Sequence, residues 1–199
     1  MKNLTLSLIA LLTSVSVSAA TLQPATKIKS PFIFGLPSNG GNGCPAGGIS
    51  IQLEKSGRVT VELAMDVRGD VAHASFSRLA CSLRIPMNVA KNYKIVVREI
   101  NNKGNYFLEP QDIVSVSQKV SIVGGPALNN PDLSLSGQGD IAWKNAVAGK
   151  NLAESVCNTR SLMLGVNTNM LLKKLGALSS NSYASLEQVQ FQILAVKCK

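Results

Sequence analysis

Apolar and polar residues alternate through most of the chain after residue 49. Apolar residues stand at every second position of residues 49–53, and again of residues 59–67. The turn-forming segment Lys55-Ser56-Gly57-Arg58 separates the two runs. A period of two is typical of β-strands with one buried face, so these two runs predict a β-hairpin.

The same alternation predicts further strands in the middle of the chain. Residues 81–85 form a third strand, which Pro86 is expected to end or to place at a sheet edge. Residues 93–108 are expected to form a second antiparallel pair, with the polar segment 101–104 as its turn. Residues 114–122 predict one more strand.

The last third of the chain is predicted to hold a long loop with short strand pieces, followed by two strands. Residues 127–154 are rich in Asn, Asp, Ser and Gly, and Trp143, the only tryptophan, is expected to cover one end of the core. Residues 162–170 and 189–195 alternate strongly, with a helical turn expected at residues 171–175. Many short alternating strands predict an all-β fold, an antiparallel β-sandwich of jelly-roll or immunoglobulin-like arrangement.

Residues 1–19 have the three parts of a signal peptide. Lys2 starts the segment, a short apolar run follows, and small residues lead to Ala19 and Ala20. Cleavage is expected after Ala19, with Ala20 as the alternative. The apolar run is shorter than the roughly 20 residues that span a bilayer, and no later segment is long and apolar enough. The sequence therefore predicts a secreted protein, extracellular or periplasmic, without a transmembrane segment.

The remainder of the chain is long enough for one domain with a sizeable core. Residues 20–48 are rich in Pro and Gly and are expected to form an N-terminal arm without regular structure over its length. Residues 49–199 are expected to form a single β-sandwich domain.

The four cysteines, Cys44, Cys81, Cys157 and Cys198, lie near predicted strand ends. Four cysteines allow three connectivities, and sequence alone does not settle them. If the first three strands form an antiparallel meander, Cys44 lies near Cys81, and if the last two strands pair, Cys157 lies near Cys198. We therefore expect these two disulfides. A zinc site is the competing interpretation, but it needs closely spaced cysteine pairs, which the chain lacks.

The chain is basic, but its charge is scattered. Removal of Lys2 with the leader leaves 19 Lys and Arg against 11 Asp and Glu, a net charge of +8. The cations form no block and have few aromatic residues among them, so nucleic-acid binding has no specific support. A solvated surface is favoured over a surface that binds anions.

Several segments, in this order, resemble the secreted family called domain of unknown function 4360. They are Gly41-Asn42-Gly43-Cys44-Pro45-Ala46-Gly47, Cys81-Ser82-Leu83 after Arg78, the Gly104 stretch after Tyr93-Lys94-Ile95, Cys157, and the cysteine close to the C-terminus. The resemblance covers nearly the whole chain after the leader. It implies a small secreted protein of bacteria and fungi with no assigned activity. Where relatives tend to carry a tryptophan near the last cysteine, this chain has Ala195-Val196-Lys197.

Residues that could carry chemistry are few, and we name no catalytic or metal-binding residue and expect no cofactor. His73 is the only histidine, and it lies close in sequence to Asp66 and Asp70, a set that could bind a divalent metal but is better explained as a solvated turn. The tripeptide Arg68-Gly69-Asp70 suits a turn. The acids of the chain, among them Glu62, Glu99, Glu109 and Asp112, are expected to face outward on amphipathic strands. The glycines of residues 40–48 are interpreted as giving the backbone the conformational freedom that a nearby disulfide requires, and not as forming a phosphate-binding loop.

These observations favour a non-enzymatic binding module, associated with the cell envelope or extracellular. Its positive charge suggests an anionic glycan, the envelope surface or an acidic protein as partner. A hydrolase that uses a pair of carboxylates on glycans is the alternative, and a structural surface protein is the second alternative. Acids that converge in a concave pocket would favour the enzyme, whereas a continuous basic or apolar face would favour binding.

Overall fold

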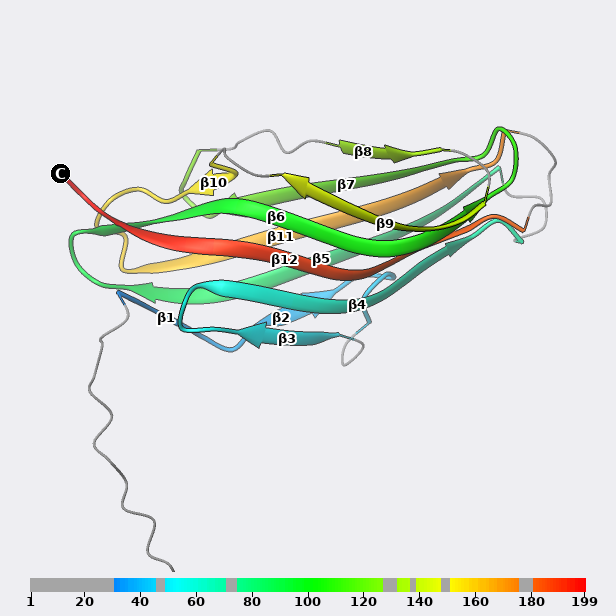
Figure 1. Ribbon diagram of the computed structural model, residues 1–199. Helices are drawn as coiled ribbons and strands as arrows, with labels where there is room; N and C mark the ends of the chain where they lie inside the picture. Colours follow the sequence, from blue (N-terminus) through cyan, green and yellow to red (C-terminus); the bar gives the residue numbers. More distant parts are fainter. Residues whose placement is uncertain are drawn as a thin grey trace, which may run out of the picture.

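The computed structural model describes residues 31–45, 49–70, 75–126, 132–136, 139–147, 151–175 and 181–199. The predicted signal peptide at residues 1–19 lies outside these ranges. Every regular element in the described ranges is a β-strand (Figure 1). The strands are β1 (Phe32–Phe34), β2 (Ser38–Gly40), β3 (Ser50–Leu53), β4 (Arg58–Arg68), β5 (Phe76–Val89), β6 (Tyr93–Leu108), β7 (Ile113–Ile122), β8 (Asp132–Leu135), β9 (Gly139–Val147), β10 (Ala153–Glu154), β11 (Ser161–Lys173) and β12 (Tyr183–Lys197).

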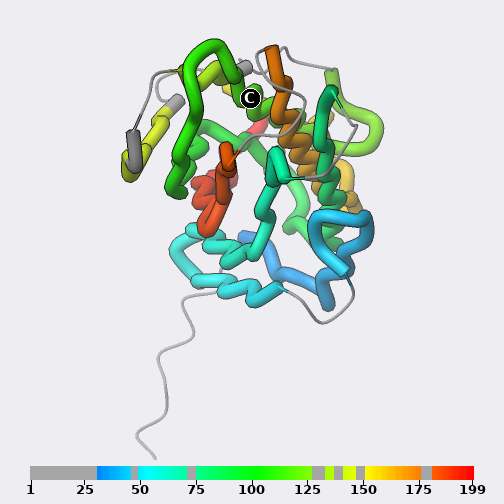
Figure 2. The backbone as a smooth tube through the Cα atoms, turned by 90° about the vertical axis from the view of Figure 1, so that its right-hand side faces the viewer, coloured from blue at the N-terminus to red at the C-terminus, as the bar shows by residue number. Residues whose placement is uncertain are grey.

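These strands form two antiparallel sheets that pack face to face. Sheet 1 has the order β1-β5-β11-β7-β8, with β2 also paired to β5. Sheet 2 has the order β10-β6-β12-β4-β3, with β9 also paired to β6. Sheet 2 lies in front in Figure 1, and Figure 2 views the two layers from the right-hand end of that picture. The predicted all-β antiparallel sandwich is confirmed.

The core lies between the sheets and follows the alternation of the sequence. On β5 every second residue from Cys81 to Val89 is buried, and on β12 Leu186, Phe191 and Ile193 are buried. Burial of one such aliphatic or aromatic side chain contributes about 1.5–3 kcal/mol. Trp143 is 5% exposed and belongs to this core, and its Nε1 donates to the carbonyl oxygen of Ser185 at 3.2 Å. The predicted hairpin of β3 and β4 is also confirmed.

The expected hairpin within residues 93–108 is wrong, because β6 runs through the polar segment without a turn. Asn102 points into the core, where its Nδ2 donates to Oε1 of Gln118 at 2.7 Å. Gly104 is buried where β9 and β12 flank the strand, and a Cβ there would collide with the carbonyl oxygen of Ser185. The residues that resemble a turn in the sequence have other roles in the structure. Asn102 makes a polar contact inside the core, and Gly104 allows two backbones to approach closely.

Pro86 does not end β5, which continues to Val89. The carbonyl oxygen of Pro86 accepts from the backbone N of Gly35 at 2.7 Å. The N and O of one residue in an antiparallel strand point to the same side. The position of the N–H that Pro86 lacks is therefore on the side of β1 and β2, next to the segment that connects these two strands. The proline thus removes no ladder bond to β11 on the other side.

Three other expectations also need correction. Short strand pieces were expected in the loop at residues 127–154, and β8 and β10 are short, but β9 is a strand of nine residues. Residues 171–173 belong to β11 instead of a helical turn. The N-terminal arm contains β1 and β2, which pair with β5 because their backbone groups complete its outer edge.

The structure has two disulfides, Cys44 to Cys81 and Cys157 to Cys198. These are the expected pairs, but the strand arrangement used to expect them is wrong. The third strand, β5, lies in sheet 1 instead of continuing the β3 and β4 hairpin, and Cys81 lies inside it instead of at its end. The last two strands do not pair either, since β11 lies in sheet 1 and β12 in sheet 2.

Candidate binding face

The outer face of sheet 2 carries polar side chains on three adjacent strands. The registers of β4, β12 and β6 define rows across this face, each made of outward residues. The rows are Arg68, Tyr183 and Phe107; Asp66 and Ser185; Glu62, Gln188 and Lys103; Thr60, Gln190 and Asn101; and Arg58, Gln192 and Glu99. From Tyr183 to Gln192 this polar face extends about 30 Å at the usual rise per strand residue.

The apolar half of the alternation explains why these polar residues face outward. Val61, Met65 and Val67 of β4 and Val189 and Phe191 of β12 are buried, so the residues that alternate with them stand on the outer face, where Thr60 is only 7% exposed. Side chains in a strand alternate between the two faces of a sheet, and the buried set fixes the register of the exposed set.

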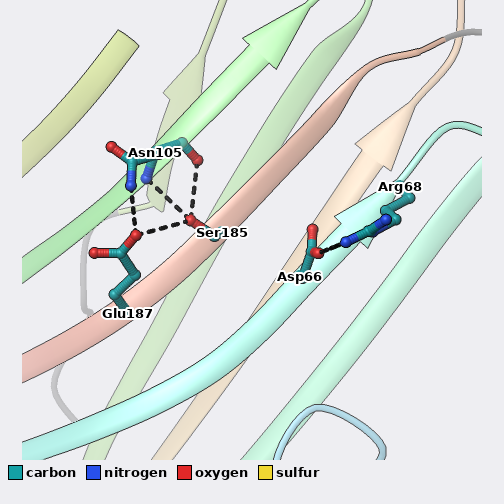
Figure 3. Close-up of polar contacts among 5 residues, drawn as sticks. All are labelled: Asp66, Arg68, Asn105, Ser185 and Glu187. Carbon is teal, nitrogen blue, oxygen red and sulfur yellow. Dashed lines mark hydrogen bonds and ion pairs between the residues drawn. The ribbon is translucent and has the colours of Figure 1, made fainter. Parts of the chain in front are cut away.

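An extra residue in β12 makes Glu187 part of this face. Between the pairs Ala184–Tyr106 and Gln188–Lys103, β12 has three residues where β6 has two, as in a β-bulge. Figure 3 shows Glu187, Ser185 and Asn105 converging. The Nδ2 of Asn105 donates to Oε1 of Glu187, to which the hydroxyl of Ser185 also donates at 3.5 Å. The backbone N of Asn105 donates to Oγ of Ser185 at 3.1 Å.

Asp66 and Arg68 form an ion pair on the neighbouring strand β4 (Figure 3). The Nη2 and Nε of Arg68 donate to Oδ2 of Asp66 at 2.6 and 2.9 Å. The hydrogen bond and the charge of Asp66 raise the pKa of Arg68 above its ordinary value. Oδ1 of Asp66 is buried and accepts no hydrogen bond from the part of the chain that the structure describes.

Three hollows follow the polar face. One of about 370 Å³ is lined by residues that include Asp66, Arg68, Asp70, Asn181, Tyr183 and Ser185. A second of about 350 Å³ is lined by residues that include Asn101, Lys103, Lys144, Asn145, Gln188 and Gln190. A small third hollow of about 50 Å³ lies among Arg58, Glu99, Asn101, Gln190, Phe191 and Gln192. Shallow concavities lined by amides, hydroxyls and charged groups suit an extended polar ligand.

An aromatic pair lies at one end of the polar face. The rings of Phe107 and Tyr183 stack with centroids 6.3 Å apart and planes at 21°. Both side chains are half-buried, and Tyr183 also lines the largest hollow of the face. The face therefore offers an apolar ring surface next to hydrogen-bonding groups.

Of the residues considered for metal binding, Asp66 and Asp70 line the same hollow, whereas His73 lies outside the described residues. Among the described residues no group of three or more His, Cys, Asp and Glu could hold a metal ion. In Arg68-Gly69-Asp70 the charged residues are exposed, and the backbone N of Gly69 donates to the carbonyl oxygen of Ser182 at 2.7 Å.

The acids differ in their surroundings. Glu62 is exposed on β4, and Glu99 is half-buried and accepts from Asn101 at 2.8 Å. The expectation that Asp112 faces outward is wrong, because its side chain is 3% exposed. It accepts from the hydroxyl of Ser182 at 2.7 Å and from the backbone N of Leu175 at 3.1 Å. Asp112 thus connects the loop after β11 to the residue before β12.

The glycines beside Cys44 bring the chain close to β5. Gly41 has a φ of 124°, in the region that favours glycine, and a Cβ there would collide with the carbonyl oxygen of Ala80. Cys44 and Cys81 are both buried in the core, so this disulfide fixes the chain between β2 and β3 against β5.

The sequence pattern alone does not identify Tyr183, Ser185, Glu187 or Asn105 as binding residues. The last strand did contain a sequence signal for a polar face. Its polar residues alternate with apolar ones, and they include Ser185, Gln188, Gln190 and Gln192. The convergence of Asn105 with Glu187 depends on a bulge and a pairing that the alternation does not reveal.

The fold and this face define a disulfide-linked antiparallel β-sandwich in which sheet 2 has a polar outer face. The chain belongs to the family described as Domain of unknown function (DUF4360), whose model matches residues 36–198. No curated protein matches the chain. Within the described residues no helix is long and apolar enough to cross a membrane.

Two solved structures are similar to this chain at low TM-scores. One is TmCBM61 in complex with beta-1,4-galactotriose, with 8% identity over 81% of this chain and 88% of that chain and a TM-score of 0.31. The other is a family two carbohydrate esterase from Cellvibrio japonicus, with 10% identity over 84% of this chain and 36% of that chain and a TM-score of 0.26. At these scores neither likeness carries an argument about function.

Proposed function

We propose that this protein is a secreted, non-enzymatic binding module of the cell envelope or the extracellular space, and that the polar face of sheet 2 binds a glycan. The observation that carries the proposal is the continuous set of amide, hydroxyl and carboxylate groups on β4, β6 and β12, with hollows along it.

The chemistry of this face suits a hydroxyl-rich ligand. Sugar hydroxyls both donate and accept, as do the amides of Asn101, Gln188 and Gln190, while the carboxylate of Glu187 accepts. The apolar side of a sugar ring can pack on an aromatic ring such as Tyr183. Each hydrogen bond contributes only about 0.5–1.5 kcal/mol, so many weak contacts along the face would have to act together.

The charge of the face favours a neutral glycan over an anionic one. The cations Arg58, Arg68, Arg98, Lys103 and Lys144 are largely offset there by Glu62, Asp66, Glu99 and Glu187. A surface of mixed sign gives little electrostatic attraction to a polyanion. The anionic partner inferred from net charge therefore belongs to a different surface.

Export is supported by the predicted leader and by the two disulfides. Disulfides persist in oxidising compartments and are rare in the cytosol. The described residues have no free cysteine.

The proposal is tested by affinity electrophoresis of the purified protein in gels that contain a β-1,4-glucan, a β-1,4-galactan or a β-1,3-glucan. Retardation by at least one neutral polysaccharide is expected. Gln188→Ala should weaken retardation about fivefold through lost hydrogen bonds. The exposed outward amide Asn88 of β5 gives the control Asn88→Ala, which should bind normally. No retardation, or equal losses for both variants, would contradict the proposal.

The hydrolase alternative has one observation in its favour, since Asp66 and Asp70 line the same hollow. Asp66, however, is held in an ion pair with Arg68, so one of its carboxylate oxygens is already occupied by the guanidinium. Release of reducing sugar ends that Asp66→Asn and Asp70→Asn abolish would establish the enzyme instead.

A further inference from the structure

The central strands of sheet 1 carry positive charge without negative charge. β5, β7 and β11 contain no Asp or Glu, but they contain Arg78, Arg84, Lys119 and Lys173. All four cations stand at outward positions, because the alternate residues Cys81, Leu83, Val120 and Leu172 are buried. The outward positions of these three strands are therefore cationic, in contrast to the mixed face of sheet 2, and Asp132 of the edge strand β8 stands opposite Ser117.

The two arginines of this face are held by neutral groups. Nη1 of Arg84 donates to Oδ1 of Asn167 at 3.0 Å and to the carbonyl oxygen of Leu83 at 2.9 Å. Nη2 of Arg78 donates to Oδ1 of Asn169 at 3.1 Å. Both ion pairs found among the described residues, Arg68 with Asp66 and Lys94 with Glu154, involve strands of sheet 2. The positive charge of sheet 1 is thus ordered but not neutralised by these contacts.

An apolar hollow lies at one end of the cationic face, where β5 begins and β11 ends. It has a volume of about 450 Å³, and its lining includes Phe76, Leu171 and Leu175. Phe76 and Leu175 are each 57% exposed. Arg78 and Lys173 also line the hollow, so cations stand directly beside exposed apolar side chains. This end lies at the right-hand side of Figure 1.

We propose that this end of sheet 1 docks on an anionic lipid surface. Phe76, Leu171 and Leu175 would enter the boundary between headgroups and acyl chains, while Arg78 and Lys173 face the lipid phosphates. Charge complementarity supplies the attraction, since cations close to an anionic membrane bind it additively. Interfacial proteins combine such cations with exposed apolar residues. A soluble polyanion would use the cations but would leave the apolar hollow exposed, which favours lipid as the occupant.

The inference does not rest on the proposed glycan function, because the two surfaces lie on opposite sheets. The test uses protein recovered after export, with both disulfides intact, and sedimentation with vesicles. One set of vesicles consists of phosphatidylcholine, and the other contains phosphatidylglycerol in addition. Binding is expected only to the anionic vesicles, and added salt should weaken it.

Two variants probe the two components of the surface. Arg78→Gln should weaken vesicle binding about fivefold, the effect of one cation near an anionic surface. Phe76→Ser should weaken it about tenfold through lost apolar burial. The matched controls are Arg58→Gln on sheet 2 and Leu36→Ser, which is 90% exposed outside the hollow, and both should bind as the parent does.

Three results would overturn the inference. The first is equal binding to neutral and anionic vesicles, and the second is an equal loss in Arg58→Gln and Arg78→Gln. The third is binding to heparin or polyglutamate through Arg78 without binding to vesicles, which would assign the face to a soluble polyanion. Binding to neutral polysaccharides tests the other sheet and can succeed or fail independently.

Discussion

A few buried polar residues hold the two sheets of the sandwich in one arrangement. Asn102 of β6 donates to Gln118 of β7, which donates to the hydroxyl of Thr168 on β11 at 3.4 Å. All three side chains are buried, so this chain of hydrogen bonds crosses the core from sheet 2 to sheet 1. Buried polar groups are costly unless paired, and these three hydrogen-bonded side chains favour one register over its alternatives, although Oδ1 of Asn102 accepts no hydrogen bond from the described residues.

Replacement of Asn102 by Ala should lower the free energy of unfolding by about 1–3 kcal/mol, because it leaves Oε1 of Gln118 without its donor. The double variant Asn102→Leu with Gln118→Leu should lose less than the single variant. Urea unfolding followed by circular dichroism measures both. A double variant less stable than Asn102→Ala would show that the polar contact is not the cause.

Close packing of the backbone requires a glycine at position 104. Gly104→Ala should destabilise the fold by about 1–3 kcal/mol, because the added Cβ meets the backbone of β12. Gly40 is the matched control, since a Cβ there would have no atom within 4 Å. Thermal unfolding of the two alanine variants makes the comparison, and equal melting temperatures would contradict the assigned contact.

At the scale of elements, the sequence predicted strands better than their partners. The alternation located β3, β4 and β7 and the cores of β5, β11 and β12, because a strand with one buried face needs that period. It failed at β6, where Asn102 and Gly104 serve internal contacts, and at β9, where a polar composition hides a strand. The partners of β11 and β12 depend on long-range packing, which no local pattern contains. The disulfide pairs were therefore reached from an incorrect strand order.

The two disulfides should differ in their effect on stability. Each closes a loop of similar length, with sequence separations of 37 and 41, for which chain entropy gives on the order of 4 kcal/mol. Cys44 and Cys81 are also buried in the core, whereas Cys157 is exposed. The variant with Cys44→Ala and Cys81→Ala should therefore be the less stable of the two double variants. Chemical unfolding under oxidising conditions compares them, and the reverse order would contradict this account.

At the scale of the whole molecule, the charge is distributed unequally over two opposite faces. At the sequence level the net charge favoured a solvated surface and suggested an anionic glycan, the envelope surface or an acidic protein as possible partners. The structure separates this charge into two faces. The face of mixed charge carries acids on β4, β6 and β12, whereas the cationic face is formed by β5, β7 and β11, which have no acids. The candidate site could not be predicted further, because Tyr183, Glu187 and Asp66 come together only after the strands pair.

Export is a property of the whole chain and has a direct test. Protein expressed in a secreting host should be found outside the cytoplasm with a mass that lacks residues 1–19. Intact mass spectrometry distinguishes cleavage after Ala19 from cleavage after Ala20. Retention of the leader, or recovery of all four cysteines as thiols, would contradict the proposed export.

Glycan binding by the outer face of sheet 2 is the function proposed for this protein. Its most direct test is a titration of the isotope-labelled protein with the oligosaccharide of a retained polysaccharide, followed by amide and side-chain chemical shifts. Shift changes should concentrate on β4, β6 and β12, with the amide groups of Asn101, Gln188 and Gln190 among them. Shifts confined to sheet 1, or none at saturating concentrations, would contradict the account.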